Sequence, residues 1–206
     1  MTEIDLLDST KTPDLNSSTP KAECPQEVHD SEMIHWYVMR SAYGREMKAK
    51  QLLEDDAIEC YVPVQKKKVK KNNEVVSQEV PVVRNLVFVR TTRKIMDPWK
   101  QTHEIGASLR YTIDKSRRKP MIVSDKAMDD FIRVTRDASD SILYLDNPDV
   151  AIAKGQRVEV VVGEFKGVQG HILRIRRDRR IVVSLDGVIA VAMASMPRDH
   201  FRLIND

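Results

Sequence analysis

The sequence predicts two domains, a mixed α+β sheet domain followed by a small all-β domain. Between residues 35 and 137, strand-like and helix-like patterns follow each other in the order β-α-β-β-α-β-α, which is typical of a compact sheet domain. Further along, Val158, Val160 and Val162 alternate with other residues, as in a strand that buries one face. A stretch rich in Asp, Ser, Asn and Pro separates the two regions. We therefore expect a tail over residues 1–33, an N-terminal domain over 34–137, a linker over 138–153 and a C-terminal domain over 154–206.

Charge is distributed unevenly along the 206 residues. The net charge is +3, but residues 1–33 carry eight acids and only two lysines, a net charge of −6, which leaves +9 for the remainder. The acidic tail lacks helical or strand periodicity, so we expect it to be disordered. The basic remainder of the chain suits a polyanionic partner, although a solvated charged face would give the same net charge.

Composition also bears on the compartment. No apolar run approaches the roughly 20 residues that span a bilayer, and the N-terminus does not resemble a secretory signal. Cys24 and Cys60 are the two cysteines and offer no disulfide framework. We expect a cytoplasmic protein.

The first predicted elements are a strand, a helix and a second strand. Residues 35–39 are aromatic and β-branched, which favours a strand. Residues 41–56 place Met47 and Leu52/Leu53 on one face of an amphipathic helix. Residues 58–62 form a second apolar run, which ends at Pro63.

A hairpin and two helices complete the predicted N-terminal domain. The basic segment around Asn72-Asn73, followed by one long apolar strand over 80–89, predicts a β-hairpin. Asp97 and Pro98 are suited to the N-cap and first position of a short helix, and residues 109–113 alternate as a strand. Ser124-Asp125 then caps a last helix with a shared apolar face, made by Met128, Phe131, Ile132 and Thr135.

Glycines punctuate the predicted C-terminal domain. Gly163, Gly167 and Gly170 fall where the chain is expected to turn sharply, since glycine enters positive φ without steric cost. Apolar runs resume at Ile172, and Arg176–Arg180 is expected at a hairpin tip.

These motifs resemble those of the NusG family. Residues 155–172 resemble the KOW motif, and Trp36–Val38, Gly44–Glu46 and Ser124–Lys126 resemble parts of the NusG N-terminal domain. The resemblance covers residues 35–204 and implies a NusG-type α/β sandwich followed by a small SH3-like β-barrel, the KOW domain. Residues 43–65 and 184–204 resemble the specialised antiterminators of long capsular polysaccharide operons. The sequence departs from the family at 83–86, where Asn85 is kept but a proline and two aromatic residues are missing.

The resemblance implies binding of RNA polymerase. NusG-like N-terminal domains present an apolar sheet surface to the clamp helices of the polymerase, and suppression of pausing or termination follows. Alternation places Leu86 with Phe88, and Tyr37 with Met39, on shared strand faces. The alternative is that such residues fill the domain core. The candidate polymerase-binding residues are Tyr37, Met39, Val83, Leu86 and Phe88.

Basic residues suggest contact with nucleic acid. In the resembling factors this side lies near the upstream DNA and the non-template strand. Lysines on a hairpin neutralise phosphates without reading bases, whereas Arg45 and Lys48 are better suited to base contacts. The alternative is a solubilising charge run. The candidate residues are Arg40, Arg45, Lys48, Lys66, Lys67 and Lys68.

A second partner is expected at the C-terminal domain. Phe165 is a large apolar residue among glycines and charges, and with Ile189 it is the candidate anchor for a ribosomal protein or a termination factor. The alternative for Phe165 is a loop residue folded over a small core. The arginines from Arg174 to Arg180 suit a solvated turn or an RNA-facing edge.

Catalysis has little support in the sequence. The five histidines are scattered, no His/Cys pair has metal-ligand spacing, and no glycine-rich phosphate loop opens a helix. We expect no enzyme activity, no cofactor and no metal. The alternatives to an operon-specific antiterminator are a housekeeping NusG-type factor and a ribosome- or rRNA-binding KOW protein.

Overall fold

The computed structural model describes most of the chain beyond the acidic tail. Residues 1–31 of the predicted tail over 1–33, and residues 138–141 and 146–153 of the predicted linker, lie outside the described residues, as do Arg176 and Arg177 of the arginine cluster. The described ranges are 32–42, 44–71, 74–137, 142–145, 155–175, 178–185 and 188–204.

The N-terminal sheet is built around β1 (His35–Arg40), as the aromatic and β-branched pattern predicts. On one side β1 pairs antiparallel with β5, and β2 pairs with the far edge of β5. On its other side β1 pairs with both β6 and β9. The bounds of these strands are Glu59–Tyr61 for β2, Leu86–Thr91 for β5, Arg110–Tyr111 for β6 and Ile122–Val123 for β9.

Two helices cover one face of this sheet, α2 (Glu46–Asp55) and α3 (Arg93–Thr102). Helix α2 begins five residues later than predicted, because the backbone N–H of Ser41 still donates to Asn85 beside β1. The predicted cap of the next helix is wrong. Thr92 is the N-cap of α3 and accepts from the backbone N–H of Ile95 at 3.2 Å, so Pro98 lies inside the helix.

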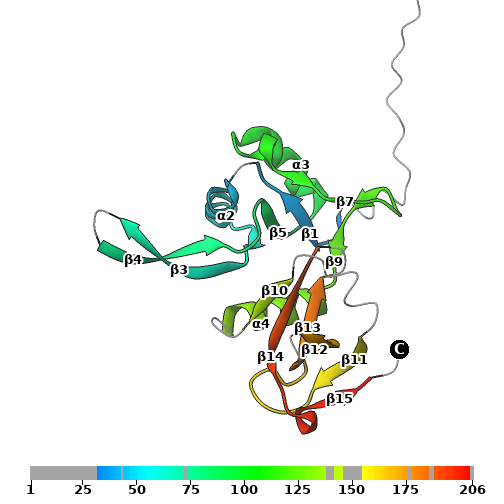
Figure 1. Cartoon of the computed structure of the whole chain (residues 1–206). Helices are drawn as coiled ribbons and strands as arrows, with labels where there is room; N and C mark the ends of the chain where they lie inside the picture. The colour runs from blue at the N-terminus through cyan, green and yellow to red at the C-terminus, as the bar shows by residue number, and fades with distance from the viewer. Residues whose placement is uncertain are drawn as a thin grey trace, which may run out of the picture.

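A long two-stranded ribbon leaves the sheet and projects away from the body (Figure 1). It consists of β3 (Val64–Lys71) and β4 (Glu74–Pro81), paired along their whole length. The predicted continuous strand over 80–89 is wrong, because the chain turns between β4 and β5 with Asn85 at φ +63°. A left-handed backbone cannot continue a strand, and asparagine tolerates it better than most residues. The shorter elements before the last helix are η1 (Gly106–Ser108), β7 (Ile113–Asp114) and β8 (Lys119–Pro120).

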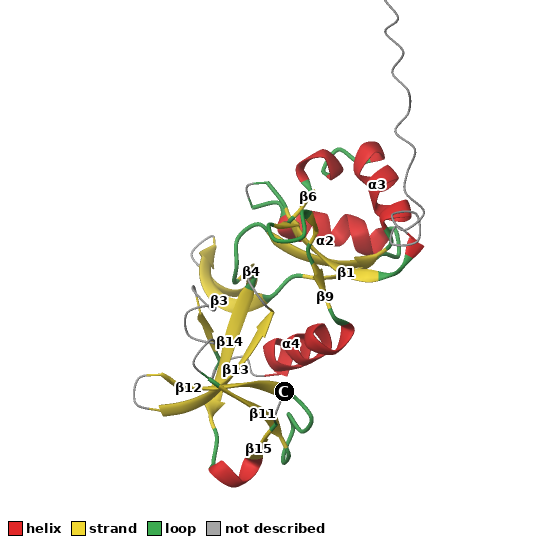
Figure 2. Ribbon diagram, turned by 90° about the vertical axis from the view of Figure 1, so that its right-hand side faces the viewer, coloured by secondary structure: helices red, strands yellow, loops and turns green. Residues whose placement is uncertain are grey.

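Helix α4 (Asp125–Asp137) lies between the N-terminal sheet and the C-terminal strands (Figure 2). The predicted cap is confirmed, since Ser124 Oγ accepts from the backbone N–H of Ala127 at 3.3 Å. The helix contacts β1 on one side and β13 and β14 on the other. Met128, Phe131 and Val134 are fully buried along it.

The C-terminal strands form one antiparallel path in the order β10-β14-β13-β12-β11-β15. Strand β10 falls within the predicted linker and pairs with β14. Among the described residues no pairing joins the two end strands β10 and β15, so the path is open and no closed barrel is found. The bounds are Leu143–Leu145 for β10, Gln156–Val160 for β11, Gln169–Ile175 for β12, Asp178–Leu185 for β13, Ile189–Ser195 for β14 and Phe201–Leu203 for β15, with η2 (Arg198–His200) before the last strand.

Two of the three predicted glycine turns are confirmed. Gly163 and Gly167 have φ of +84° and +88° in the loop between β11 and β12. Gly170 instead lies within β12, and a Cβ there would meet the carbonyl oxygen of Val182 at 2.6 Å. Close approach of the neighbouring strand therefore requires this glycine.

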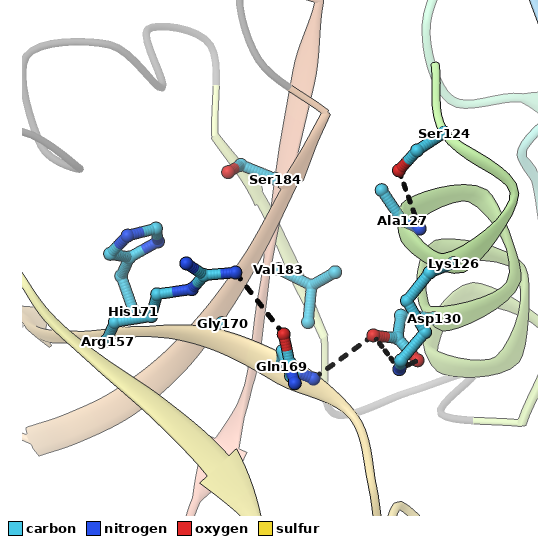
Figure 3. Close-up of a pocket in the computed structure, with 10 residues that line it drawn as sticks. All are labelled: Ser124, Lys126, Ala127, Asp130, Arg157, Gln169, Gly170, His171, Val183 and Ser184. Carbon is cyan, nitrogen blue, oxygen red and sulfur yellow. Dashed lines mark hydrogen bonds and ion pairs between the residues drawn. The ribbon is translucent and has the colours of Figure 1, made fainter. Parts of the chain in front are cut away.

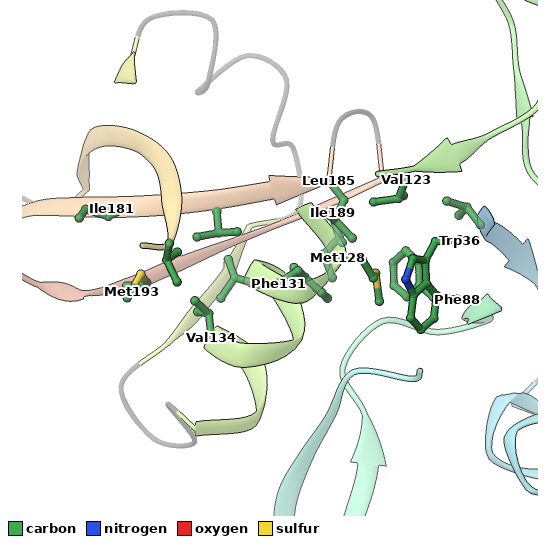
Figure 4. Close-up of a cluster of buried hydrophobic side chains, with 14 of the residues drawn as sticks. Trp36, Phe88, Val123, Met128, Phe131, Val134, Ile181, Leu185, Ile189 and Met193 are labelled. Carbon is green, nitrogen blue, oxygen red and sulfur yellow. The ribbon is translucent and has the colours of Figure 1, made fainter. Parts of the chain in front are cut away.

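A single apolar cluster joins the two halves of the molecule (Figure 4). It includes Trp36 and Phe88 from the N-terminal sheet, Phe131 from α4, and Leu185 and Ile189 from the C-terminal strands. We call this the joint cluster. In the described part of the chain, no helix combines the length and the apolar character needed to cross a membrane.

Candidate functional site

The predicted polymerase-binding residues divide between the two faces of the N-terminal sheet. Tyr37 and Met39 belong to the cluster under α2 and α3, with exposed fractions of 1% and 0%. Leu86 and Phe88 belong to the joint cluster on the opposite face, each with an exposed fraction of 0%. The five residues therefore do not form one exposed surface in this conformation.

Strand register explains the division. In the β1–β5 pairing, Tyr37 lies opposite Val89 and Val38 lies opposite Phe88. Residues that face each other across an antiparallel pair share one side of the sheet, and the side changes at each step along a strand. Tyr37 and Phe88 must therefore point to opposite faces, although each pair predicted to share a strand face does so.

Val83 is the accessible member of the set. It lies in the turn between β4 and β5, is half-buried, and packs against the joint cluster beside Leu86 and Phe88. Asn85 shapes this turn: its carbonyl oxygen accepts from Ser41 N at 3.0 Å, and its Oδ1 accepts from Gly44 N at 3.3 Å. Asn85 thus fixes the end of β1 against the start of β5.

The predicted nucleic-acid residues are exposed. Arg40 ends β1, and Arg45 and Lys48 lie at the start of α2, where buried Glu46 accepts from Ser41 Oγ at 3.5 Å. The three lysines Lys66–Lys68 follow one another on β3 of the ribbon. Arg40 pairs with Leu86, and the short turn before Leu86 leads directly to the ribbon, so the two basic groups share one end of the sheet.

The predicted C-terminal anchor lies against α4. Phe165 is half-buried and packs on the joint cluster, and Ile189 is a buried member of it with an exposed fraction of 3%. The loop that carries Phe165 is held by polar contacts from α4. Arg133 donates to the carbonyl oxygens of Glu164 and Lys166, and Lys126 donates to that of Gly167 at 3.0 Å.

Asp130 links α4 to the C-terminal strands, a role that no sequence motif indicates. Its side chain is buried, and the carboxylate accepts from Lys126 Nζ at 2.6 Å and from the backbone N–H of Gln169 at 3.1 Å (Figure 3). The bond to Gln169 connects α4 to the first residue of β12. The Lys126/Asp130 spacing of four residues was the one available signal, and it indicates only a helical ion pair.

A polar cavity of about 500 Å³ lies beside this link, where α4 meets the C-terminal strands (Figure 3). Arg157, His171 and Ser184 line it from the strands, and Ser124 and Lys126 line it from the helix. Within the described ranges, no three His, Cys, Asp or Glu side chains are grouped to hold a metal ion. Burial and the nearby carboxylate of Glu54 raise the pKa of the Cys60 thiol to about 12, so the thiol stays protonated and weakly nucleophilic near neutral pH.

Comparison with known families identifies the N-terminal half. The profile of the NusG family, described as transcription termination factor nusG, matches residues 34–132. Residues 34–132 form a NusG-type domain. No curated protein matches the chain.

The NusG-type domain includes every strand from β1 to β9 and extends into α4. Members of this family bind RNA polymerase, and the match supports a general role for the chain in transcription elongation or termination. Val83 and the basic residues lie within the NusG-type domain, whereas Phe165, Ile189 and the C-terminal strands lie beyond it.

Proposed function

We propose that the chain is a transcription antitermination and processivity factor that binds elongating RNA polymerase. The match of the NusG-type domain carries this proposal. The factor acts by binding. It bridges elements of the polymerase and favours the closed, elongating state, because the factor has a higher affinity for that state. No reaction is catalysed, and no cofactor or metal takes part. A cytoplasmic location, where polymerase works, is part of the same proposal.

The polymerase clamp helices are proposed to bind the sheet face that carries Val83, Leu86 and Phe88. Val83 is accessible now, but the joint cluster covers Leu86 and Phe88. A partner helix reaches those two residues only when the covering elements move away. Tyr37 and Met39 support this surface from the opposite side, where α2 and α3 cover them.

Arg40, Arg45, Lys48 and the ribbon lysines Lys66–Lys68 are proposed to contact the upstream DNA and the non-template strand. Their exposure at one end of the sheet supports this role. Lysine contacts with phosphates add affinity that falls with salt and depends little on sequence.

The C-terminal strands are proposed to be a KOW domain. The pairing of β11 with both β12 and β15, and the glycine loop at Gly163 and Gly167, support this assignment. Phe165 and Ile189 are the proposed anchors for a ribosomal protein or a termination factor. Both residues pack at the joint cluster, so a partner binds them only after the C-terminal strands separate from α4.

Replacing Val83 with aspartate tests the polymerase surface. Because Val83 is half-buried in a turn, the variant is expected to fold, while the charge opposes an apolar contact. We expect at least about a tenfold loss of affinity for purified core polymerase, measured by pull-down at several protein concentrations. Ile113→Asp is the matched control, since Ile113 is an exposed apolar residue on β7. Equal binding by wild type and Val83→Asp would remove this surface from the proposal.

The polysaccharide operons are proposed as targets on the resemblance of residues 43–65 and 184–204 to the specialised antiterminators. Deleting the gene should change transcripts of a few long operons. Changes at most genes would indicate the housekeeping factor instead. Co-purification with ribosomes and not with polymerase subunits would favour the ribosome-binding alternative.

A further inference from the structure

A short hairpin, made of β7 and β8, projects from the edge of the N-terminal sheet where β6 and β9 pair with β1. Its base is fixed to the middle of β1, because the backbone N–H of Thr112 donates to the carbonyl of Val38 at 2.8 Å and that of Val38 donates to Met121 at 3.2 Å. The hairpin and the β3–β4 ribbon project from opposite sides of the sheet (Figure 1). None of residues 113–120 belongs to the joint cluster, so separation of the two halves of the molecule leaves the hairpin in place.

The hairpin carries a concentrated positive charge. Residues 113–120 contain four Lys or Arg residues and one acid, a net charge of +3. The acid, Asp114, is engaged within the turn, because its Oδ1 accepts from the backbone N–H and the hydroxyl of Ser116 at 2.8 and 2.6 Å. The four basic residues are all exposed, so the outer surface of the hairpin is a positive patch. They are Lys115, Arg117, Arg118 and Lys119.

The acidic tail enters the described part of the chain at Glu32, beside α3. Glu32 Oε1 accepts from Lys94 Nζ at 2.9 Å, in the first turn of that helix. This end of α3 adjoins the start of β1, because His35 lies opposite Thr91 at the end of β5. Residues 22–32 carry four acids and no Lys or Arg. The part of the tail next to the sheet domain is therefore strongly acidic.

Of the two basic projections, the hairpin is the closer to the point where the tail enters. Along β1, three residues separate His35 from Val38 at the hairpin base, which corresponds to about 10 Å. The ribbon lies at the opposite end of β1, where Arg40 pairs with Leu86. The tail residues 23–31 span up to about 30 Å when extended. They are therefore long enough to cross from α3 to the hairpin.

We propose that the acidic tail docks on the β7–β8 hairpin and withholds the hairpin cations from other polyanions. The opposite charges of the two segments support this occupant. Exposed ion pairs are individually weak, but covalent attachment gives the tail a high effective concentration at the hairpin. Salt screens charges over about 10 Å at 0.1 M, so docking weakens as the salt concentration rises. Docking is a property of the chain alone and goes beyond the proposed binding of polymerase.

A nitroxide spin label on Cys24 of the full chain locates the tail by NMR. Cys60 is the other cysteine, and its raised pKa keeps that thiol protonated and slow to react. The same labelling reaction on Cys24→Ser corrects for label at Cys60. We expect the label to broaden the amide signals of residues 115–119 more than those of residues 66–68 on the ribbon, and the broadening to fade as salt is added. Broadening that is equal or stronger on the ribbon, or absent from the hairpin, would overturn the docking.

Two charge reversals of equal size separate docking at the hairpin from a general attraction to the basic chain. Lys115→Glu combined with Arg117→Glu changes the net charge of the hairpin from +3 to −1. Lys67→Glu combined with Lys68→Glu makes the same change on the ribbon, where uncharged residues lie opposite both lysines. We expect the hairpin pair to abolish the broadening of the hairpin amides and the ribbon pair to leave it near wild type. Equal losses for the two pairs would show that the tail responds to net charge alone, which contradicts the docking.

Neutralising the tail tests the consequence of docking. Glu23→Gln, Glu27→Gln and Asp30→Asn together are expected to tighten binding of a short duplex of random sequence several-fold at low salt, because released hairpin cations neutralise phosphates. Fluorescence anisotropy with the labelled duplex and the full chain measures this gain. In the Lys115→Glu/Arg117→Glu background the same tail changes should have little effect. An unchanged affinity, or an equal gain in both backgrounds, would refute the withholding of hairpin cations, whereas the polymerase pull-down reports on the proposed function separately.

Discussion

Phe131→Ala is expected to lower the free energy of unfolding of the chain by about 3–5 kcal/mol. The Phe131 side chain is fully buried in α4, with its ring centroid 5.9 Å from that of Phe88 and 6.4 Å from that of Tyr61. It also belongs to the joint cluster that contains Leu185 and Ile189. Truncation therefore leaves a cavity between two sheets, and neither sheet closes it alone.

Urea denaturation of the full chain measures the effect of Phe131→Ala. Asp129→Ala is the control, because Asp129 lies two residues earlier on α4 and is exposed. We expect that control to change stability by less than about 0.5 kcal/mol. A Phe131→Ala loss as small as that of the control would show that the joint cluster does not hold the two halves together.

Asp130→Ala is expected to cost about 1.5–3 kcal/mol, the range for a hydrogen bond to a charged group. The substitution removes the carboxylate that accepts the hydrogen bond from the backbone N–H of Gln169, and it removes the ion-pair partner of Lys126. The ion pair between Lys126 and Asp130 contributes little to this loss of stability, because the Lys126 side chain is 58% exposed and water partly screens its charge. Most of the expected loss therefore comes from the bond to Gln169.

Hydrogen exchange at the Gln169 amide measures the loss of the bond from Gln169 to Asp130 directly. Protection of the Gln169 N–H is expected to fall in Asp130→Ala and to recover in part in Asp130→Asn, which keeps one acceptor oxygen. Amides of β1 and β5, far from the bond, should keep their protection. Unchanged exchange at Gln169 in Asp130→Ala would contradict the proposed link.

Local patterns predicted most of the elements but not the points where two local signals compete. Asp97-Pro98 is a good helix start, yet Thr92 caps the helix five residues earlier and the proline lies within it. The apolar run over 80–89 looked continuous because the left-handed conformation of Asn85 is a tertiary feature, stabilised by its bonds to Ser41 and Gly44. Such bonds join residues about forty positions apart and leave no periodic signal.

The candidate polymerase-binding surface was also only partly predictable from local sequence patterns. Alternation correctly paired Leu86 with Phe88, but periodicity does not say what covers a face. The cover on that face comes from α4 and from strands one hundred residues further along the chain. Strand β10 fell in a segment interpreted as a linker, because three apolar residues are too few to distinguish an edge strand from a local contact.

A single-round elongation assay with purified RNA polymerase tests the central claim most directly. On a template with defined pause and termination sites, addition of the full chain is expected to shorten pauses and increase read-through, and Val83→Asp is expected to do neither. Identical transcript profiles with and without a saturating amount of the chain would contradict the account.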